Sequence, residues 1–244
     1  MADRPSVTAT TSNQVDAEEA RIRDAYARRS ADRRDSWFSP GHLFMIQERE
    51  RRVLKLLVRE RFDRLDDKRI LEIGCGKGTW LRDFVKWGAR AEHITGVDLL
   101  PDRIVEARRT CPPGIVFLCG SAAELDVPSA SHDLVLQSTV FTSILDSRMR
   151  EAVAAEMLRV LRPDGLILWY DYHVDNPANP DVRGVGRRDI HRLFRGCRVD
   201  LERVTLAPPI ARAIAPFSRI ACQLLEAVPL FRTHYLGVIR KGQQ

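Results

Sequence analysis

The sequence predicts an α/β fold: a seven-stranded, mostly parallel sheet flanked by helices, with N-terminal helices and a helical insertion before the last strand. From residue 70 onward, short apolar runs alternate with stretches of helical period, which is typical of parallel strands joined by helices. A glycine-rich loop follows the first of these runs. With 244 residues, the chain is long enough for one well-buried domain with additions and too short for two large ones.

The N-terminal part is predicted to lie outside the sheet. Residues 1–14 are rich in Thr and Ser and poor in apolar side chains, so we expect a disordered tail. Residues 15–66 are expected to form a helical cap. Its first helix carries many charges and one thin apolar line at Ile22 and Tyr26, and we interpret it as a surface helix that closes over a cofactor. The domain proper is expected over residues 67–244.

The strands of the sheet are expected at the apolar runs 70–73, 94–98, 115–119, 133–138 and 166–172, with helices at 79–87, 102–110 and 148–161. A Pro-Gly turn at residues 161–165 is expected to join the last of these helices to the fifth strand. Two further strands, near 199–206 and 235–240, would complete the sheet.

The segment 208–231 is longer than the tight link expected between the last two strands, and it has apolar side chains at helical spacing. We interpret it as a cover over a substrate pocket. A helix packed on the sheet or a dimer contact fits equally well. A membrane-surface helix ranks third, because the charges are few.

Three alternating glycines, ending at Gly78, follow the first predicted strand. Glycines let the backbone turn sharply and approach a ligand that a Cβ would block, and the next helix points its N-terminus at that ligand. A dinucleotide loop would have its third glycine at position 79, where this chain has Thr79. Asp98 ends the second strand, at about the 20-residue offset where an acid accepts both ribose hydroxyls. Taken alone, Asp98 would be read as a helix cap.

These motifs together resemble the class I (Rossmann-like) S-adenosylmethionine-dependent methyltransferases, among them bacterial small-molecule methyltransferases of unsettled substrate. The resemblance covers roughly residues 70–172 and comprises, in order, Glu72 with the three glycines, Gly96-Val97-Asp98, Gly120-Ser121-Ala122, the stretch from Leu125 to Val135, and the stretch from Glu156 to Gly165. It implies an enzyme with S-adenosylmethionine as its cofactor. Ser121 stands where the family usually has Asp, so the contact with the adenine amino group is expected to be weaker or made by the backbone.

The resemblance also implies which residues bind the cofactor: Glu72, Gly74, Cys75, Gly76, Gly78, Asp98, Leu99, Ser121, Ala122, Gln137 and Ser138. Asp171 and His173 follow at the carboxyl end of the fifth strand, where substrate groups project in open α/β sheets, and they are the candidate catalytic bases. The alternative readings are that Asp171 caps a loop and that His173 is merely exposed. Cys75 is read as a small filler between glycines.

The composition and charge of the chain indicate its expected cellular compartment and binding partners. We expect no transmembrane segment and no signal peptide, because the chain has no apolar stretch of about 18 residues, and we therefore expect a cytoplasmic protein. Five cysteines without C-x-x-C spacing indicate reduced thiols and no metal site. The net charge of +6 permits nucleic acid as a partner, but the arginines are spread along helices. We expect a small-molecule substrate, no nucleic acid and a possible homodimer.

The expected reaction is methyl transfer to a small-molecule acceptor through a hydroxyl oxygen, with a sugar or another biosynthetic intermediate as candidate acceptors. The sugar reading rests on stretches such as Trp169-Tyr170-Asp171-Tyr172, which resemble bacterial methyltransferases associated with sugar pathways. The alternatives are an RNA or protein methyltransferase and a non-catalytic cofactor-binding protein. The fourth strand ends in Gln137-Ser138-Thr139-Val140 and lacks the Asn-Pro-Pro-Tyr motif of base N-methylation.

Overall fold

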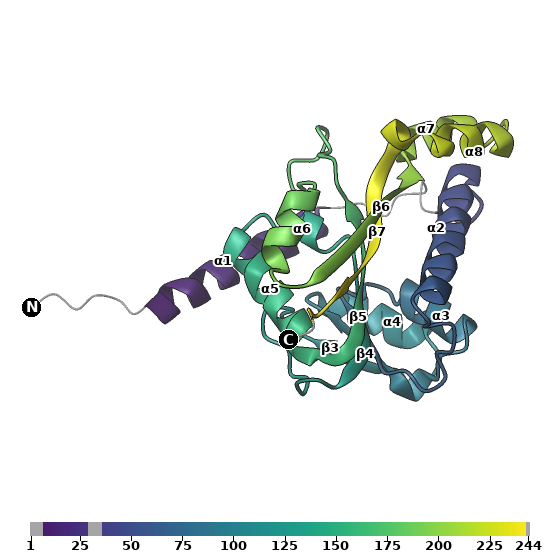
Figure 1. Cartoon of the computed structure of the whole chain (residues 1–244). Helices are drawn as coiled ribbons and strands as arrows, with labels where there is room; N and C mark the ends of the chain where they lie inside the picture. The colour runs from purple at the N-terminus through teal and green to yellow at the C-terminus, as the bar shows by residue number, and fades with distance from the viewer. Residues whose placement is uncertain (1–6, 29–35, 243–244) are drawn as a thin grey trace, which may run out of the picture.

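The computed structural model describes residues 7–28 and 36–242, with side chains from Gln14 onward. One sheet runs through the domain in the strand order β3-β2-β1-β4-β5-β7-β6 (Figure 1). The strands are β1 Ile70–Ile73, β2 Ile94–Asp98, β3 Val116–Cys119, β4 His132–Ser138, β5 Leu161–Tyr172, β6 Arg198–Leu206 and β7 Arg232–Arg240. Strands β1 to β5 pair in parallel, whereas β7 is antiparallel to both β5 and β6. The predicted seven-stranded, mostly parallel sheet is confirmed.

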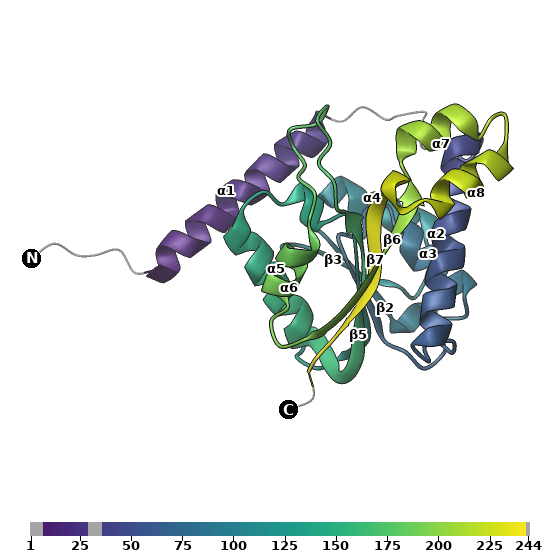
Figure 2. The ribbon, with the colours of Figure 1, turned by 45° about the horizontal axis from the view of Figure 1, so that its top comes forward.

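Helices cover both faces of this sheet (Figure 2). They are α1 Val7–Ala27, α2 Pro40–Arg59, α3 Thr79–Lys86, α4 Pro101–Thr110, α5 Ser147–Val160, α6 Arg187–Leu193, α7 Pro208–Ile214 and α8 Arg219–Ala227, with short 3-10 turns η2 Ala91–His93, η3 Phe141–Ser143 and η4 Pro229–Phe231. Helices α1, α5 and α6 lie on one face, and α2, α3 and α4 lie on the other. None of the helices in the described ranges is long and apolar enough to cross a membrane.

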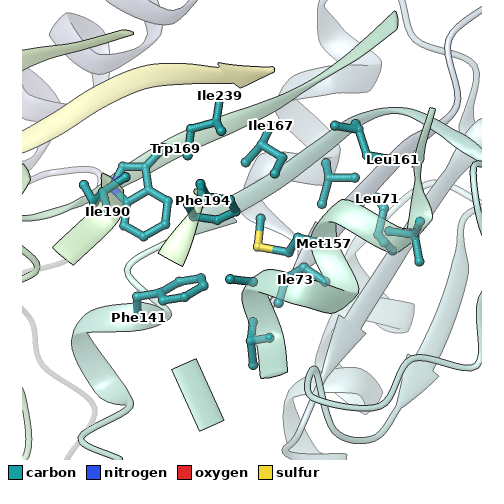
Figure 3. Packing of buried hydrophobic residues seen from close by; sticks show 14 of the residues in the cluster. Leu71, Ile73, Phe141, Met157, Leu161, Ile167, Trp169, Ile190, Phe194 and Ile239 are labelled. Carbon is teal, nitrogen blue, oxygen red and sulfur yellow. The ribbon is translucent and has the colours of Figure 1, made fainter. Parts of the chain in front are cut away.

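The alternation of side chains along each strand builds one core on each face. Leu71 and Ile73 point toward α5, where they join Met157 and the aromatic group of Phe141 and Trp169 (Figure 3). Phe141 and Trp169 have ring centroids 4.8 Å apart. On the other face, strand residues pack against Val53, Trp80 and Phe84. Both faces of the sheet are buried, which is why the parallel strands read as nearly continuous apolar runs.

Two boundaries differ from the sequence-based expectation. Helix α1 begins at Val7, inside the segment 1–14 that we expected to be disordered, whereas residues 1–6 lie outside the described residues. No Gly or Pro interrupts Val7–Ala27, so nothing in this segment breaks a helix. Strand β5 begins at Leu161 and includes the predicted turn 161–165. Leu161 pairs with His132, and Leu166 is the next residue of β5 to pair, with Leu134. Residues 162–165 of the predicted turn therefore fall in the register shift between these two pairs.

The helical insertion before β7 consists of two helices rather than one, because Pro216 lies between α7 and α8. Its inner face packs on α2: Ala211, Ala215 and Cys222 form a small core with Phe44 and Leu206. Gly41 of α2 lies so close to α7 that a Cβ there would come within 2.7 Å of Arg212 Cα. The insertion therefore packs on the rest of the domain.

Candidate functional site

The glycine loop after β1 makes a tight turn at the carboxyl edge of the sheet. Gly74, Gly76 and Gly78 have φ angles of 67°, 52° and 73°, in the left-handed region that L side chains rarely adopt. A Cβ on Gly74 would come within 2.5 Å of Val140 Cγ2. Cys75 N donates to Val97 O at 2.9 Å and ties the loop to β2. The loop holds its backbone against a cavity.

Asp98 fixes this loop from the end of β2. One carboxylate oxygen accepts from Gly76 N at 2.7 Å, and the other accepts from Leu100 N at 2.9 Å. The side chain is 9% exposed and lines the cavity. Because an ionised carboxylate has about four acceptor positions, Asp98 can hold both backbone groups and still accept hydrogen bonds from a ligand.

The cavity encloses about 230 Å³ between the carboxyl ends of β1, β2 and β4 and helix α1. Six of the predicted cofactor residues line it: Gly74, Gly76, Asp98, Leu99, Ala122 and Ser138. Ile22 and Tyr26, from the helix that we expected to close over a cofactor, also line it. The lining residues that the sequence analysis did not assign to the site are Val97, Leu100, Arg103, Gly120, Thr139, Val140, Ser143, Ile144 and Met149. The insertion 208–231 contributes none of the lining residues, so the structure gives no support to a cover over this cavity.

Helix α1 lies over the cavity and is hydrogen-bonded to the protein on two sides of it. Arg23 donates to Leu99 O at 2.7 Å, and Tyr26 Oη lies 3.3 Å from Ser143 Oγ. The Glu18 carboxylate accepts from Asp146 N at 3.2 Å and also from Leu145 N. The apolar line that the sequence shows on this helix therefore faces the cavity.

Glu18 is ionised in this arrangement. Burial by itself would raise the pKa of its carboxyl. The hydrogen bond from Arg21 and the two backbone donors outweigh that effect and lower the pKa below its usual range.

Glu72 lies beneath the glycine loop and does not line the cavity. It is buried, and its Oε2 has no hydrogen-bond partner among the described residues. Burial raises the pKa of Glu72 well above its usual range, although the Arg49 guanidinium opposes the shift. Arg49 is itself held over the Trp80 ring, 4.2 Å from its centroid, and 3.3 Å from the Asp83 carboxylate. A buried acceptor without a partner next to a glycine cradle suits a ligand with a positively charged group.

The remaining predicted cofactor residues support the walls of the cavity. Gln137 is fully buried, and its Oε1 accepts from Val140 N at 3.2 Å. Ser121 Oγ accepts from Ala123 N at 3.1 Å. Gly78 begins α3. Cys75 is buried, and burial raises the pKa of its thiol, which fits the small filler that we expected rather than a nucleophile.

The structure does not bring the two candidate bases to the cavity. Asp171 is fully buried, and its carboxylate accepts from Thr142 N at 3.1 Å, from Thr142 Oγ1 and from Tyr172 N at 2.8 Å. Burial raises its pKa to about 6. His173 Nε2 lies 3.0 Å from Arg232 O, and its ring packs on Tyr235. Neither side chain lines the cavity. Among the described residues, no group of His, Cys, Asp and Glu could hold a metal ion.

The comparison with known protein families matches this part of the fold. A model of the methyltransferase domain matches residues 70–165, from the start of β1 into β5. Residues 70–165 are therefore similar to a methyltransferase domain. The expected resemblance to class I methyltransferases is confirmed, and the matched residues contain the glycine loop and strands β1 to β4.

One solved structure shares the fold over the length of the chain. The 1,6-didemethyltoxoflavin-N1-methyltransferase of Burkholderia thailandensis, with S-adenosylhomocysteine bound, aligns with a TM-score of 0.58 over 100% of this chain and 93% of that protein, at 19% identity. At this identity the likeness shows the fold.

Two curated relatives match part of the chain in sequence. The fatty-acid O-methyltransferase of Mycolicibacterium smegmatis is 36% identical over 108 residues, which are 44% of this chain and 38% of the relative. The malonyl-[acyl-carrier protein] O-methyltransferase of Serratia marcescens is 31% identical over 102 residues, 42% of this chain and 37% of the relative. The matches thus span about two fifths of each relative's length.

Proposed function

We propose that this chain is an S-adenosylmethionine-dependent methyltransferase that acts on an oxygen atom of a small molecule. The observation that carries the proposal is the cavity where the glycine loop, the Asp98 carboxylate and helix α1 meet. The methyltransferase domain supports the cofactor, and the two relatives named as O-methyltransferases support the acceptor oxygen.

The chain's own residues fit this cofactor. Asp98 would accept hydrogen bonds from the two ribose hydroxyls, while Leu99 and Ala122 would flank the adenine. The amino group of the methionine part would lie on the glycine loop, on the other side of which Glu72 is buried with its Oε2 unpartnered among the described residues. The bound cofactor supplies a methyl group on a sulfonium, and the protein's task is to hold the acceptor in line with it at about 3–3.5 Å.

The groups beside the reacting end are neutral. Ser138, Thr139 and Ser143 line that part of the cavity, and Asp98 is the one carboxylate among the described lining residues. Both Asp98 oxygens hold backbone N–H groups, so this side chain is poorly placed to remove a proton. An acceptor that is already ionised, such as a carboxylate, needs no base. A carboxylate oxygen is therefore a second candidate acceptor, in addition to the hydroxyl that the sequence predicts. Only the sequence resemblance supports a sugar as the acceptor.

A matched pair of acceptors tests the reaction. The purified chain is incubated with labelled S-adenosylmethionine and either a long-chain fatty acid or the corresponding primary alcohol, and cofactor binding is measured separately by calorimetry with S-adenosylhomocysteine. We expect binding and a labelled ester or ether. Binding without label in either acceptor would refute these two oxygen acceptors, and absence of binding would refute the cofactor assignment.

We also propose the cytoplasm as the compartment, and a homodimer stays a prediction.

A further inference from the structure

The outer face of the helical insertion carries a cluster of exposed apolar side chains, which we call the insertion patch: Phe217, Ile220, Leu224, Val228 and Leu230. Phe217 is 89% exposed and Leu230 is 80% exposed. Ile220 and Leu224 lie four residues apart on one side of α8, and Phe217 lies in the turn between α7 and α8. The inner face of the same insertion is buried against α2, so the patch is the second apolar face of an element that is already packed.

A second segment brings aromatic side chains to the same corner. Trp37 and Phe38, just before α2, are 58% and 95% exposed. They lie a few residues before Gly41, which contacts Arg212 in α7. Helices α7 and α8 project at this corner beside α2 (Figures 1 and 2). Bulky apolar side chains from two segments therefore gather at one exposed corner of the domain.

The charges of the insertion are of one sign at its surface. Residues 208–231 contain Arg212, Arg219 and one acid, Glu226. Glu226 is 2% exposed, whereas Arg219 is exposed and lies between Phe217 and Ile220 in the sequence. The insertion thus shows apolar and basic side chains to its surroundings and no acidic one.

We propose that the insertion patch docks onto a lipid bilayer surface that contains anionic phospholipids. Apolar side chains on short helices, with aromatic and basic residues among them, are what an interfacial anchor requires: the apolar groups enter the acyl boundary and the basic groups pair with lipid phosphates. A second copy of this chain fits less well. A two-fold contact through the patch would bring Arg219 against the same patch, which offers no exposed acid to pair with it.

The position of the insertion gives this docking a consequence for the domain. β7 begins beside the carboxyl end of β5, where His234 pairs with Tyr172, so the insertion lies at the sheet edge that also holds the cofactor cavity. Docking through the patch brings that edge of the domain to the membrane surface. The inference does not depend on the reaction proposed above, because it rests on the exposed face alone.

Vesicle sedimentation tests the proposal with the full chain. The protein is mixed with phosphatidylcholine vesicles with or without about 30 mol% phosphatidylglycerol. We expect binding to the anionic vesicles that weakens as salt is raised. The partition coefficient of F217S/L224S should be at least about tenfold lower than that of the parent. The partition coefficient of R219Q on anionic vesicles should be about fivefold lower. The control V58S/V105S, which changes exposed valines on α2 and α4, should bind as the parent does.

Several outcomes would overturn the docking proposal. Absence of parent binding to either vesicle would do so, and so would equal binding by F217S/L224S and the parent. Light scattering is recorded in parallel, and a dimer that F217S/L224S converts to a monomer, without vesicle binding, would identify a second copy as the occupant. Circular dichroism and binding of S-adenosylhomocysteine confirm that each variant is folded. Vesicle binding without cofactor binding would leave the docking intact and refute the proposed enzyme function.

Discussion

Replacing Asp98 by Asn is the sharpest test of the proposed cofactor site, because this carboxylate would have two roles. In the protein alone it accepts from Gly76 N and Leu100 N. With the cofactor bound it would also accept from the ribose hydroxyls. Asn has nearly the same size but only one acceptor oxygen, so one backbone N–H would face an amide donor instead.

The magnitudes follow from the number of hydrogen bonds that lose their acceptor. A hydrogen bond to a charged group contributes about 1.5–3 kcal/mol. The loss of one such bond to the backbone should lower the free energy of unfolding by about 2 kcal/mol, which for a chain of this size lowers the Tm by about 4–8 °C. The loss of the charged acceptor for the ribose should weaken cofactor binding by about 3 kcal/mol, or roughly 100-fold.

Calorimetry with S-adenosylhomocysteine and a thermal melt separate the two roles. Asp126→Asn is the control, since Asp126 is exposed, and its effect should stay within about 0.5 kcal/mol. If Asp98→Asn lowers the Tm but binds S-adenosylhomocysteine as tightly as the parent, Asp98 only braces the loop and the assignment of the ribose contact is wrong.

Three further changes have defined outcomes. Gly74→Ala places a Cβ within 2.5 Å of Val140 Cγ2 at a φ of 67°, so it should cost about 1–2 kcal/mol of stability and most of the cofactor affinity; calorimetry that shows unchanged affinity would contradict the cradle. Ile22→Ala on α1 should weaken S-adenosylhomocysteine binding about fivefold, by about 1 kcal/mol, and no change would mean that α1 does not close on the ligand. Burial lowers the pKa of His234 to about 3. The unfolded chain therefore binds a proton that the folded chain does not, and stability should fall by up to about 1.4 kcal/mol per pH unit below about pH 6.5. Urea unfolding at several pH values should show a shallower slope in His234→Phe than in the parent, and the variant should keep the part that comes from His132, whose pKa burial lowers to about 4.

The parts of the site that the sequence could predict are backbone features and residues tied to them. Three alternating glycines after an apolar strand require the turn that the structure shows, and Asp98 at its offset falls at the end of the neighbouring parallel strand. Both features depend on local backbone geometry, so they can be predicted from a single sequence. Val140 and Ser143 line the same cavity and carry no such local signal. Their place is set by the η3 turn after β4, and Thr139, just before this turn, is tied to β5 by the bond from Thr139 N to Tyr170 O.

The N-terminal side of the cavity shows a different kind of limit. The apolar line at Ile22 and Tyr26 predicts that one face of α1 is covered, and the structure places that face on the cavity. Periodicity alone cannot say which surface covers it. That surface is decided by bonds between residues far apart in the chain, such as Arg23 to Leu99 O and Glu18 to Asp146 N.

The position of Asp171 differs from the one expected for a catalytic base, although the rule behind that expectation holds for the sheet. Carboxyl ends of parallel strands do carry functional groups, but side chains alternate along β5, and residue 171 points to the face that η3 covers. There its carboxylate accepts from both the backbone N–H and the hydroxyl of Thr142. Thr142 immediately precedes Ser143 and Ile144, two residues of the cavity wall. The acid that the sequence predicts as a base thus holds the turn that forms the cavity wall beside α1.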